Sequence, residues 1–254
     1  MKDSIIEQYR YFLKDSVRKT INFSETDQSR GIAPPPLEKP FADDAVRIDL
    51  VSHDGGWDAI GGITLIEAMG KRKSRRHYGN EPLSLEELSF LLWATQGIRQ
   101  QIDAGHALRT VPSAGCRHAL ETYLSIVNCE GIDGGLYRYL PTEHQLLLEY
   151  ADDGMAEKIF AASFGQRFLE QAAATFLWTA IPYRMEWRYD RAAHKVIAID
   201  AGHVCQNLYL ACEAIGAGTC AIAAYDQEAM DRLVGVDGTD EFVIYLAPVG
   251  KKAE

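Results

Sequence analysis

Long apolar segments are missing from this chain of 254 residues, although 47% of its residues are hydrophobic. No apolar run approaches the roughly 18 to 20 residues that a membrane-spanning helix needs. The first residues, Met1 to Ser4, also lack the charged and then apolar order of a signal peptide. We therefore expect a cytoplasmic protein without a membrane segment.

Positive charge is also scarce. The chain has 26 Lys and Arg residues against 36 Asp and Glu residues, which gives a formal net charge of -10. Proteins that bind nucleic acids usually carry an excess of basic side chains to neutralise phosphates. The balance argues against a nucleic-acid partner, so any site for an anion must be local.

Paired cysteines and metal-ligand spacings are absent from the sequence. There is no Cys-x-x-Cys and no His-x-x-x-His, which argues against a disulfide framework and against a zinc site. A metal-dependent hydrolase, which would use His194, Asp200 and His203, is disfavoured for the same reason. We expect no metal and a set of reduced, mostly buried thiols: Cys116, Cys129, Cys205, Cys212 and Cys220.

The chain is long enough to bury one large core, and its N-terminal part differs in composition from the rest. Prolines 34, 35, 36 and 40 lie among charged residues, and two Gly-Gly pairs follow. We expect residues 1–63 to form a helix at Ile5–Val17 and an extended arm, which lies over a main domain of residues 64–254.

The pattern after Leu65 predicts alternating groups of helices and strands. Helices are expected at Thr64–Met69, at Ser84–Thr95 with a capping box and Gly97 as its end, at Met155–Ala173, at His203–Ile215 with Gly216 as its cap, and after Asp226. Strands are expected at Thr122–Asn128, Leu136–Tyr139, Gln145–Tyr150, Thr175–Ile181, Thr219–Ala224 and Phe242–Leu246. This order predicts an α+β fold with a mainly antiparallel sheet flanked by helices.

Four segments are candidates for ligand binding. Arg72-Lys73-Ser74-Arg75-Arg76 is the densest basic cluster, and guanidinium and hydroxyl groups suit a phosphate, although a basic run is often only a solvated face. Pro112-Ser113-Ala114-Gly115 combines small residues with a proline-fixed turn, as a backbone must if a flat ring is to lie against it. Ser113 lacks the Gly-x-Ser-x-Gly context of a nucleophile.

The other two segments lie near the C-terminal end of the sequence. Gly216-Ala217-Gly218 follows a predicted helix and precedes a strand, which reverses the order of a dinucleotide-binding loop. These glycines either allow close approach of a planar ligand or only end the helix. Lys251 and Lys252 follow the last strand, and they either complete a phosphate site or belong to a frayed tail.

Together the segments resemble the nitroreductase superfamily. Arg72 to Tyr78 resembles its Arg-x-Ser-x-Arg/Lys-x-Phe/Tyr motif, Pro112-Ser113 its Pro-Ser segment, Asp200-Ala201-Gly202-His203 the start of its central helix, and the Gly216 loop its Gly-Leu-Gly turn. The residues 91–98, 135–141 and 34–40 are similar to those of the SagB-type (ThcOx) dehydrogenase branch, whose members oxidise azolines in peptide maturation.

The resemblance implies an FMN-dependent fold, an intertwined homodimer, and a ping-pong exchange of hydride between NAD(P)H or another donor and a second small-molecule or peptide substrate. Tyr189 is the candidate catalytic residue. Arg72, Ser74 and Arg76 would hold the FMN phosphate and ribityl chain, and residues 113–115 would contact the flavin from the partner subunit. The implied cofactor-binding set is Arg72, Lys73, Ser74, Arg76, Pro112, Ser113, Ala114, Gly115, Gly216, Ala217, Gly218, Lys251 and Lys252.

One position departs from the azoline-oxidising pattern. Those members resemble one another in a Lys-Tyr pair, whereas this chain has Arg188-Tyr189. Arginine stays protonated and cannot act as a general base, which puts azoline oxidation in doubt. A flavin-binding or flavin-storing protein without turnover is the alternative from a different class.

Overall fold

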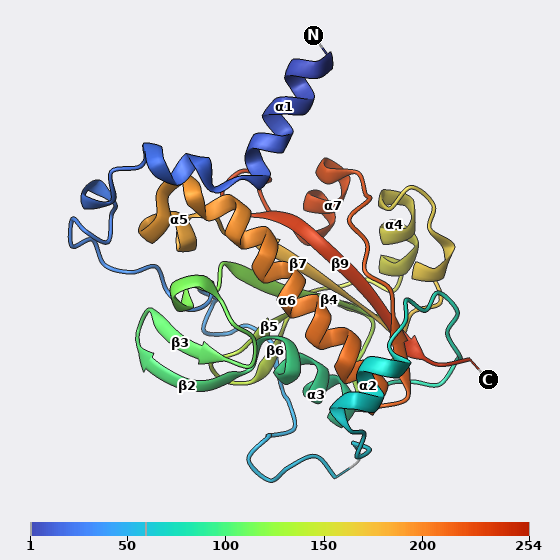
Figure 1. The fold of residues 1–254 in the computed structure, drawn as a ribbon. Helices are drawn as coiled ribbons and strands as arrows, with labels where there is room; N and C mark the ends of the chain where they lie inside the picture. Colours follow the sequence, from blue (N-terminus) through green and yellow to red (C-terminus); the bar gives the residue numbers. More distant parts are fainter. Residues whose placement is uncertain (1, 59, 254) are drawn as a thin grey trace.

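A computed structural model describes residues 2–58 and 60–253 of the chain (Figure 1). The helices are α1 (Lys2–Leu13), α2 (Leu65–Lys71), α3 (Leu85–Gln96), α4 (Met155–Ala162), α5 (Tyr183–Tyr189), α6 (Ala193–Ala214) and α7 (Gln227–Val234). The strands are β1 (Arg47–Asp49), β2 (Ile98–Asp103), β3 (His106–Arg109), β4 (Leu120–Ile126), β5 (Gly135–Leu140), β6 (Gln145–Ala151), β7 (Ala174–Ala180), β8 (Ala217–Thr219) and β9 (Phe242–Lys251). The α+β prediction is confirmed.

The main sheet has seven strands in the order β1-β6-β5-β4-β7-β9-β8, and each neighbouring pair is antiparallel. The predicted meander of β4, β5 and β6 is therefore confirmed. Strand β1 lies at one edge of this sheet, so the arm contributes a strand to the sheet of the main domain. The division of the chain at residue 63 stays a prediction.

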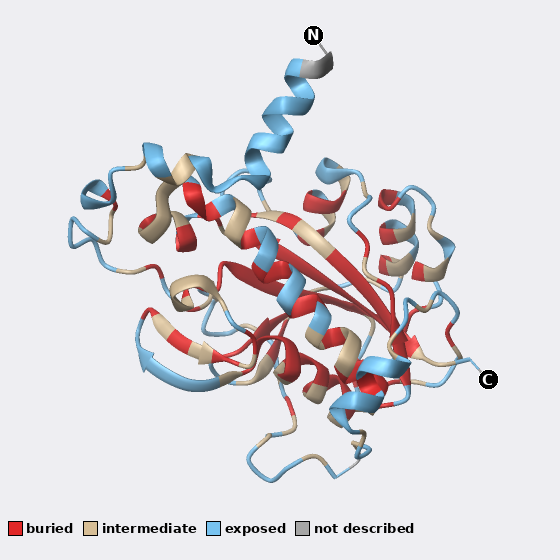
Figure 2. Cartoon of the chain, in the orientation of Figure 1, coloured by how far each residue is buried: buried red, intermediate tan, exposed pale blue. Residues whose placement is uncertain are grey.

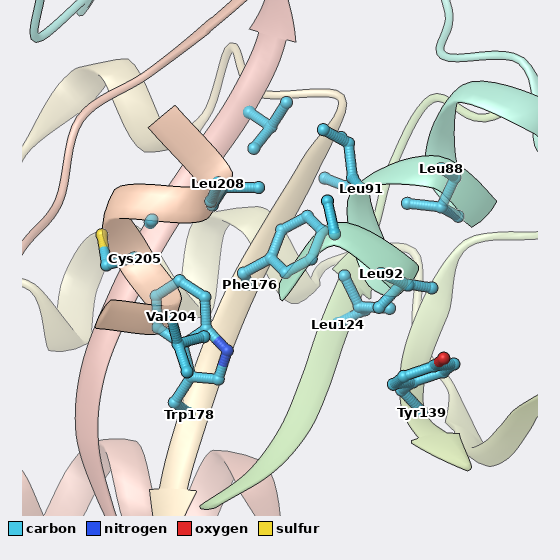
Figure 3. Close-up of a cluster of buried hydrophobic side chains, with 14 of the residues drawn as sticks. Leu88, Leu91, Leu92, Leu124, Tyr139, Phe176, Trp178, Val204, Cys205 and Leu208 are labelled. Carbon is cyan, nitrogen blue, oxygen red and sulfur yellow. The ribbon is translucent and has the colours of Figure 1, made fainter. Parts of the chain in front are cut away.

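Helices cover both faces of the sheet and give the molecule two cores. Helices α3 and α6 pack on one face, where Leu91 and Leu208 meet Phe176 and Trp178 of β7 (Figure 3). Helices α4 and α7 pack on the other face against Leu177 and other side chains. Strand β7 is buried on both faces, which explains why its sequence is apolar throughout instead of alternating.

The arm is fastened to the sheet at Lys39. Its backbone N–H donates to Glu121 Oε1 at 2.8 Å, and its Nζ donates to Glu241 Oε2 at 2.6 Å and to Tyr123 Oη at 2.9 Å. Arg138 donates to the Lys39 carbonyl at 2.8 Å. Helix α1, in contrast, projects from the body, and its residues 4–13 are all exposed (Figure 2).

Several predicted boundaries are wrong. The helix expected at Met155–Ala173 ends at Ala162, because Phe164 and Gly165 both have positive φ, and only the short 3-10 turn Arg167–Leu169 follows. The strand expected at Thr219–Ala224 is instead the short β8, which ends at Thr219. The N-terminal helix ends at Leu13, and a 3-10 helix, Asp15–Thr20, continues from it.

The central helix α6 begins ten residues before the predicted start. The 3-10 turn Asp190–Ala192 leads directly into it, and Ala192 provides no side-chain cap. His203 is therefore a residue of the helix interior and not of its N-terminus. The end of the helix matches the prediction, since Gly216 with a φ of 66° follows Ile215.

The cysteines are reduced and mostly buried, as the sequence predicts. Cys129, Cys205, Cys212 and Cys220 are buried, Cys116 is half-buried, and all five are free. Within residues 2–58 and 60–253, no helix is both long enough and apolar enough to cross a membrane.

Candidate functional site

Three of the candidate segments meet at the C-terminal end of α6. The backbone N–H of Arg75 donates to the Thr219 carbonyl at 2.9 Å, and the N–H of Lys252 donates to the Gly216 carbonyl at 3.1 Å. Residues 72–76, 216–219 and 251–252 thus form one continuous surface, which we call the cradle. The structure brings together residues that are far apart in the sequence.

Tyr209 of α6 organises the cradle. Its hydroxyl accepts a hydrogen bond from the Ala221 N–H at 2.9 Å and lies 3.0 Å from the Ser74 Oγ. The Arg72 guanidinium lies over its ring, 5.2 Å from the centroid. Tyr209 therefore fixes both the motif serine and the first motif arginine.

Some cations of the cradle are neutralised within the chain. Arg75 and Lys252 both pair with Glu213, one turn beyond Tyr209, and Lys251 pairs with Glu87 of α3. The Lys251 Nζ also donates to the Ile215 carbonyl at 3.2 Å, at the end of α6 where the helix dipole is negative. Lys251 and Lys252 are thus ordered parts of β9 and its end, and not a frayed tail.

Other cations of the cradle have no carboxylate partner. Among the described residues, Arg72, Lys73 and Arg76 form no ion pair, and Arg76 lies over the Phe168 ring at 5.8 Å from its centroid. The Thr219 Oγ1 beside Ser74 is buried and has no hydrogen-bond partner within the described part of the chain. Unpaired guanidinium groups next to an unsatisfied hydroxyl fit a ligand with a phosphate-like anion.

Gly218 of the glycine loop leaves no room for a side chain. A Cβ on Gly218 would lie 2.5 Å from the Cδ of Arg75, so the close packing of the basic segment on β8 requires glycine there. Ala217 is fully buried and pairs with Lys251 in the sheet. Gly218 therefore does more than follow the end of α6, whereas a Cβ on Gly216 would meet no atom within 4 Å.

The Pro112 segment lies elsewhere on the same subunit. Pro112 is exposed, and the residues after it form a turn, residues 113–118, with Ala114–Cys116 as a 3-10 helix. A Cβ on Gly115 would lie 2.7 Å from the Tyr189 Oη. The structure thus places Tyr189, the candidate catalytic residue, beside the turn and not in the cradle.

The turn also contacts the middle of α6 through Asp200. Hydrogen bonds from the Ser113 side chain and the Ala114 backbone favour the charged carboxylate, but burial outweighs them and raises the pKa of Asp200. Asp200 and Tyr209 are nine residues apart on one helix, which is about 14 Å along its axis. The turn and the cradle are therefore separate sites within one chain.

An apolar groove of about 450 Å³ lies between α2, α3 and α6. Trp93 and Phe90 of α3 and Leu210 and Ala214 of α6 line it, together with Arg99 of the β2–β3 hairpin. His53 stacks on Trp93 with 5.5 Å between ring centroids, and Trp57 packs edge-on against Phe90 at 5.5 Å. Mostly apolar grooves with few polar groups are typical of small-molecule sites and of subunit interfaces.

The residues of the disfavoured metal site are not gathered. His194 pairs with Glu186 at 2.6 Å, whereas His203 lies 3.9 Å from Asp200. In the described ranges, no cluster of three or more potential ligands could hold a metal ion.

The fold and the cradle together define a mainly antiparallel α+β protein with a cationic surface at the end of α6. The sequence profile of the Nitroreductase family matches residues 69–251, which include all of the cradle except Lys252. The chain belongs to the Nitroreductase family, a family of oxidoreductases.

Relatives agree with this assignment. The protein MJ1384 of Methanocaldococcus jannaschii, named as a nitroreductase, is 32% identical over 193 residues, or 76% of this chain and 93% of that protein. A solved structure from Ralstonia eutropha JMP134, also described as a nitroreductase, has a TM-score of 0.67 and 26% identity, and the match covers 87% of this chain and 98% of that one.

A more distant relative has a described processing role. The trifolitoxin-processing protein TfxB of Rhizobium leguminosarum bv. trifolii is 28% identical over 142 residues, which is 53% of this chain. The match spans 38% of TfxB, well under half of that protein.

Proposed function

We propose that this protein is an FMN-dependent oxidoreductase that transfers hydride between NAD(P)H or another donor and a second substrate. The observation that carries the proposal is the cradle, where Arg72, Lys73 and Arg76 form no ion pair within the described ranges and the buried Thr219 Oγ1 has no partner there. An acidic protein with this local excess of positive charge is suited to one bound phosphate rather than to a polyanion.

Each part of the cradle has a role in this proposal. Arg72 and Arg76 bind the phosphate, Ser74 and Thr219 hydrogen-bond to it or to the ribityl chain, and Lys73 adds charge. Arg75, Lys251 and Lys252, whose charges are paired with Glu213 and Glu87, hold the cradle in shape and contribute to its field. The exposed backbone of Gly216 allows close approach of a ligand at the end of α6, and Gly218 allows Arg75 to pack against β8. When bound, FMN supplies the two-electron redox chemistry, and the protein supplies position and electrostatics.

We further infer that the active species is a homodimer. Helix α6 exposes a continuous stripe of Ile199, Gly202, His203 and Gln206, and the apolar groove begins beside it at Leu210. Ile199 is 47% exposed in the single chain, and small and apolar residues on a long helix are typical of a helix that packs against a second copy. In such a dimer, residues 113–115 and Tyr189 serve the FMN of the partner, and the groove is part of a cleft that both substrates share in a ping-pong cycle.

A second candidate function, azoline dehydrogenation in a processed peptide, is favoured by the likeness to TfxB. The geometry beside Tyr189 weakens it. The Arg188 guanidinium lies 5.4 Å from the centroid of the Tyr189 ring. Arginine is not a general base, so Tyr189 is the side chain of this pair that could exchange a proton. We therefore propose the nicotinamide-linked activity first.

The visible absorption spectrum of the purified protein tests the proposal. Flavin bands that bleach under anaerobic NADH or NADPH would establish a reducible flavoenzyme and would show which nicotinamide it prefers. Bound flavin that no donor reduces and that supports no turnover with an electron acceptor would instead indicate a storage protein. The absence of flavin bands after reconstitution with FMN would contradict the proposal.

A further inference from the structure

The turn at residues 113–118 is held in an unfavourable backbone conformation. Gly115, Cys116 and His118 have φ values of 59°, 54° and 45°, and two of these residues are not glycine. Each such residue costs about 1 kcal/mol or more unless its surroundings fix it. Something outside the turn must therefore keep it in place.

Asp200 provides a link from α6 to this turn. The Ser113 Oγ accepts a hydrogen bond from the His118 N–H at 3.0 Å, so its own proton is free to be donated to Asp200. The Ala114 backbone N–H is also within hydrogen-bonding reach of Asp200. The Asp200 carboxylate thus links the middle of α6 to the start of the turn. It also reaches the end of the turn indirectly, because Ser113 bonds to His118.

The burial of Asp200 is unfavourable for packing alone. The residue is 6% exposed in the interior of α6, and among the described residues its Oδ2 has no hydrogen-bond partner. The His203 ring, 46% exposed, is 3.9 Å away and only partly compensates. A small apolar residue would fill this helix position at lower cost, which indicates that the carboxylate serves the turn.

We propose that Asp200 is the positioning residue that fixes the 113–118 turn for its contact with the flavin of the partner subunit. This inference rests on the proposed FMN-dependent dimer. Asp200 belongs to α6, whose exposed stripe faces the second copy. The helix that joins the two subunits therefore also positions the turn that each subunit contributes to its partner's site.

Mixed dimers test this assignment. One subunit carries Asp200→Ala with an intact cradle, and the other carries Arg72→Ala and Arg76→Ala with an intact Asp200. The two are co-expressed with different tags and purified by successive affinity steps, and FMN binding is measured by quenching of flavin fluorescence. Glu228→Ala, an exposed carboxylate on α7, replaces Asp200→Ala in the control dimer.

The expected pattern is complementation. The Asp200→Ala homodimer should bind FMN about 10-fold more weakly than the unsubstituted protein, which corresponds to one lost hydrogen bond to a charged group. The cradle homodimer should bind no measurable FMN. Their mixed dimer should bind one FMN per dimer with unsubstituted affinity, because one of its two sites combines an intact cradle with an intact turn. The control dimer should also contain one such site.

Three results would overturn the inference. A mixed dimer with no tight site, beside a control dimer that has one, would show that Asp200 acts within its own subunit. Unchanged FMN affinity in the Asp200→Ala homodimer would show that the turn does not need it. Asp200→Asn keeps an oxygen that accepts the Ser113 proton, so it should stay within about 3-fold of the unsubstituted affinity, and an equal loss in a folded Asn variant would contradict positioning through this bond. The unsubstituted protein is measured first, so absence of FMN binding there identifies failure of the proposed function itself.

Discussion

Glu213 and Asp200 are two buried carboxylates on α6, thirteen residues apart, and their surroundings shift their pKa values in opposite directions. Burial alone would raise the pKa of Glu213, but hydrogen bonds from Lys252 and Arg75 outweigh it and lower the value. At Asp200 burial dominates, because the neutral Ser113 and Ala114 groups and the nearby His203 compensate less. The cradle is thus held by ion pairs of Glu213 with two cations. The turn is held by the Asp200 carboxylate, whose Oδ2 has no hydrogen-bond partner among the described residues.

The difference shows how one helix can support two kinds of site. Glu213 pairs with two cations but carries only one negative charge, so it orders the cradle and leaves the cradle with a net positive charge. Asp200 lies where its ionisation is unfavourable, so its contribution is one of position rather than of stability. The following predictions separate the two roles, from the largest expected effect to the smallest.

Removing the unpaired arginines of the cradle should have the largest effect. Replacing Arg72 and Arg76 together by alanine should weaken FMN binding by at least about 100-fold, because each charged hydrogen bond contributes roughly 1.5 to 3 kcal/mol. Neither arginine forms an ion pair among the described residues, so urea unfolding of the apoprotein should change little. Arg232→Ala, an exposed arginine on α7, is the control. Equal FMN affinity in both variants would place the phosphate elsewhere.

Glu213→Gln should lower stability rather than binding. Loss of the buried charge leaves Arg75 and Lys252 facing each other, and the free energy of unfolding should fall by about 3 kcal/mol at pH 7. The folded pKa of Glu213 is lowered, so its stabilisation is present above its ordinary value of 4.5 and is lost as the pH falls through the folded value. Urea titrations between pH 3 and pH 8 should show the variant and the unsubstituted protein converging at the acidic end. A constant difference would mean that the carboxylate acts without its charge.

Gly115→Ala tests how tightly the turn is packed. The left-handed φ should cost about 1 kcal/mol. The contacts of the new Cβ with the Tyr189 Oη at 2.7 Å and with the Cδ and Nε of Arg188 at 2.9 Å should cost about 1 kcal/mol more. Gly131 has a similar φ of 75° with no atom near a Cβ, so Gly131→Ala measures the backbone cost alone. Thermal unfolding should rank Gly115→Ala below Gly131→Ala, and in a background with both Arg188→Ala and Tyr189→Ala the two glycine substitutions should cost the same. Equal losses in the unsubstituted background would show that neither side chain constrains the turn.

Asp200→Asn should have the smallest effect on stability, and in the opposite direction from Glu213→Gln. The folded pKa of Asp200 is raised above its ordinary 3.8, so its ionisation destabilises the protein as the pH rises through the folded value. The variant should gain up to about 1 kcal/mol at pH 7 and none at pH 3. A loss at pH 7 in urea unfolding, with exposed Glu228→Gln unchanged, would show that the turn depends on the charge itself.

Local chemistry made several boundaries predictable. The Ser84 capping box, the Asp226 cap and the positive φ of Gly216 all depend on residues within one turn of the helix end, and the structure has each of them. The start of α6 carries no such signal, because Ala192 continues from a 3-10 turn. The break after Ala162 depends on Phe164 in a left-handed conformation, which its residue type does not predict.

The parts of the candidate site that lie in distinctive short segments were predictable from the sequence. The parts that come from single residues of α6 were not. The basic run, the glycine loop and the terminal lysines stand out in the sequence, and the structure places them together. Tyr209 and Glu213 have the i, i+4 spacing of any helix face, so nothing in the sequence separates them from packing residues. The assignment of the turn to the partner's flavin depends on a second chain and stays a prediction.

The fastening of the arm at Lys39 bears on how the chain reaches its native state during synthesis. The Lys39 ammonium pairs with the carboxylate of Glu241, which lies 202 residues further along the sequence. Lys39 therefore leaves the ribosome long before that carboxylate exists. Contacts of such high sequence separation close late, after the nearer strands have paired. Until β9 and the adjoining Glu241 are in place, the Lys39 ammonium lacks this carboxylate, and a chaperone that holds the arm would protect the nascent chain during that interval.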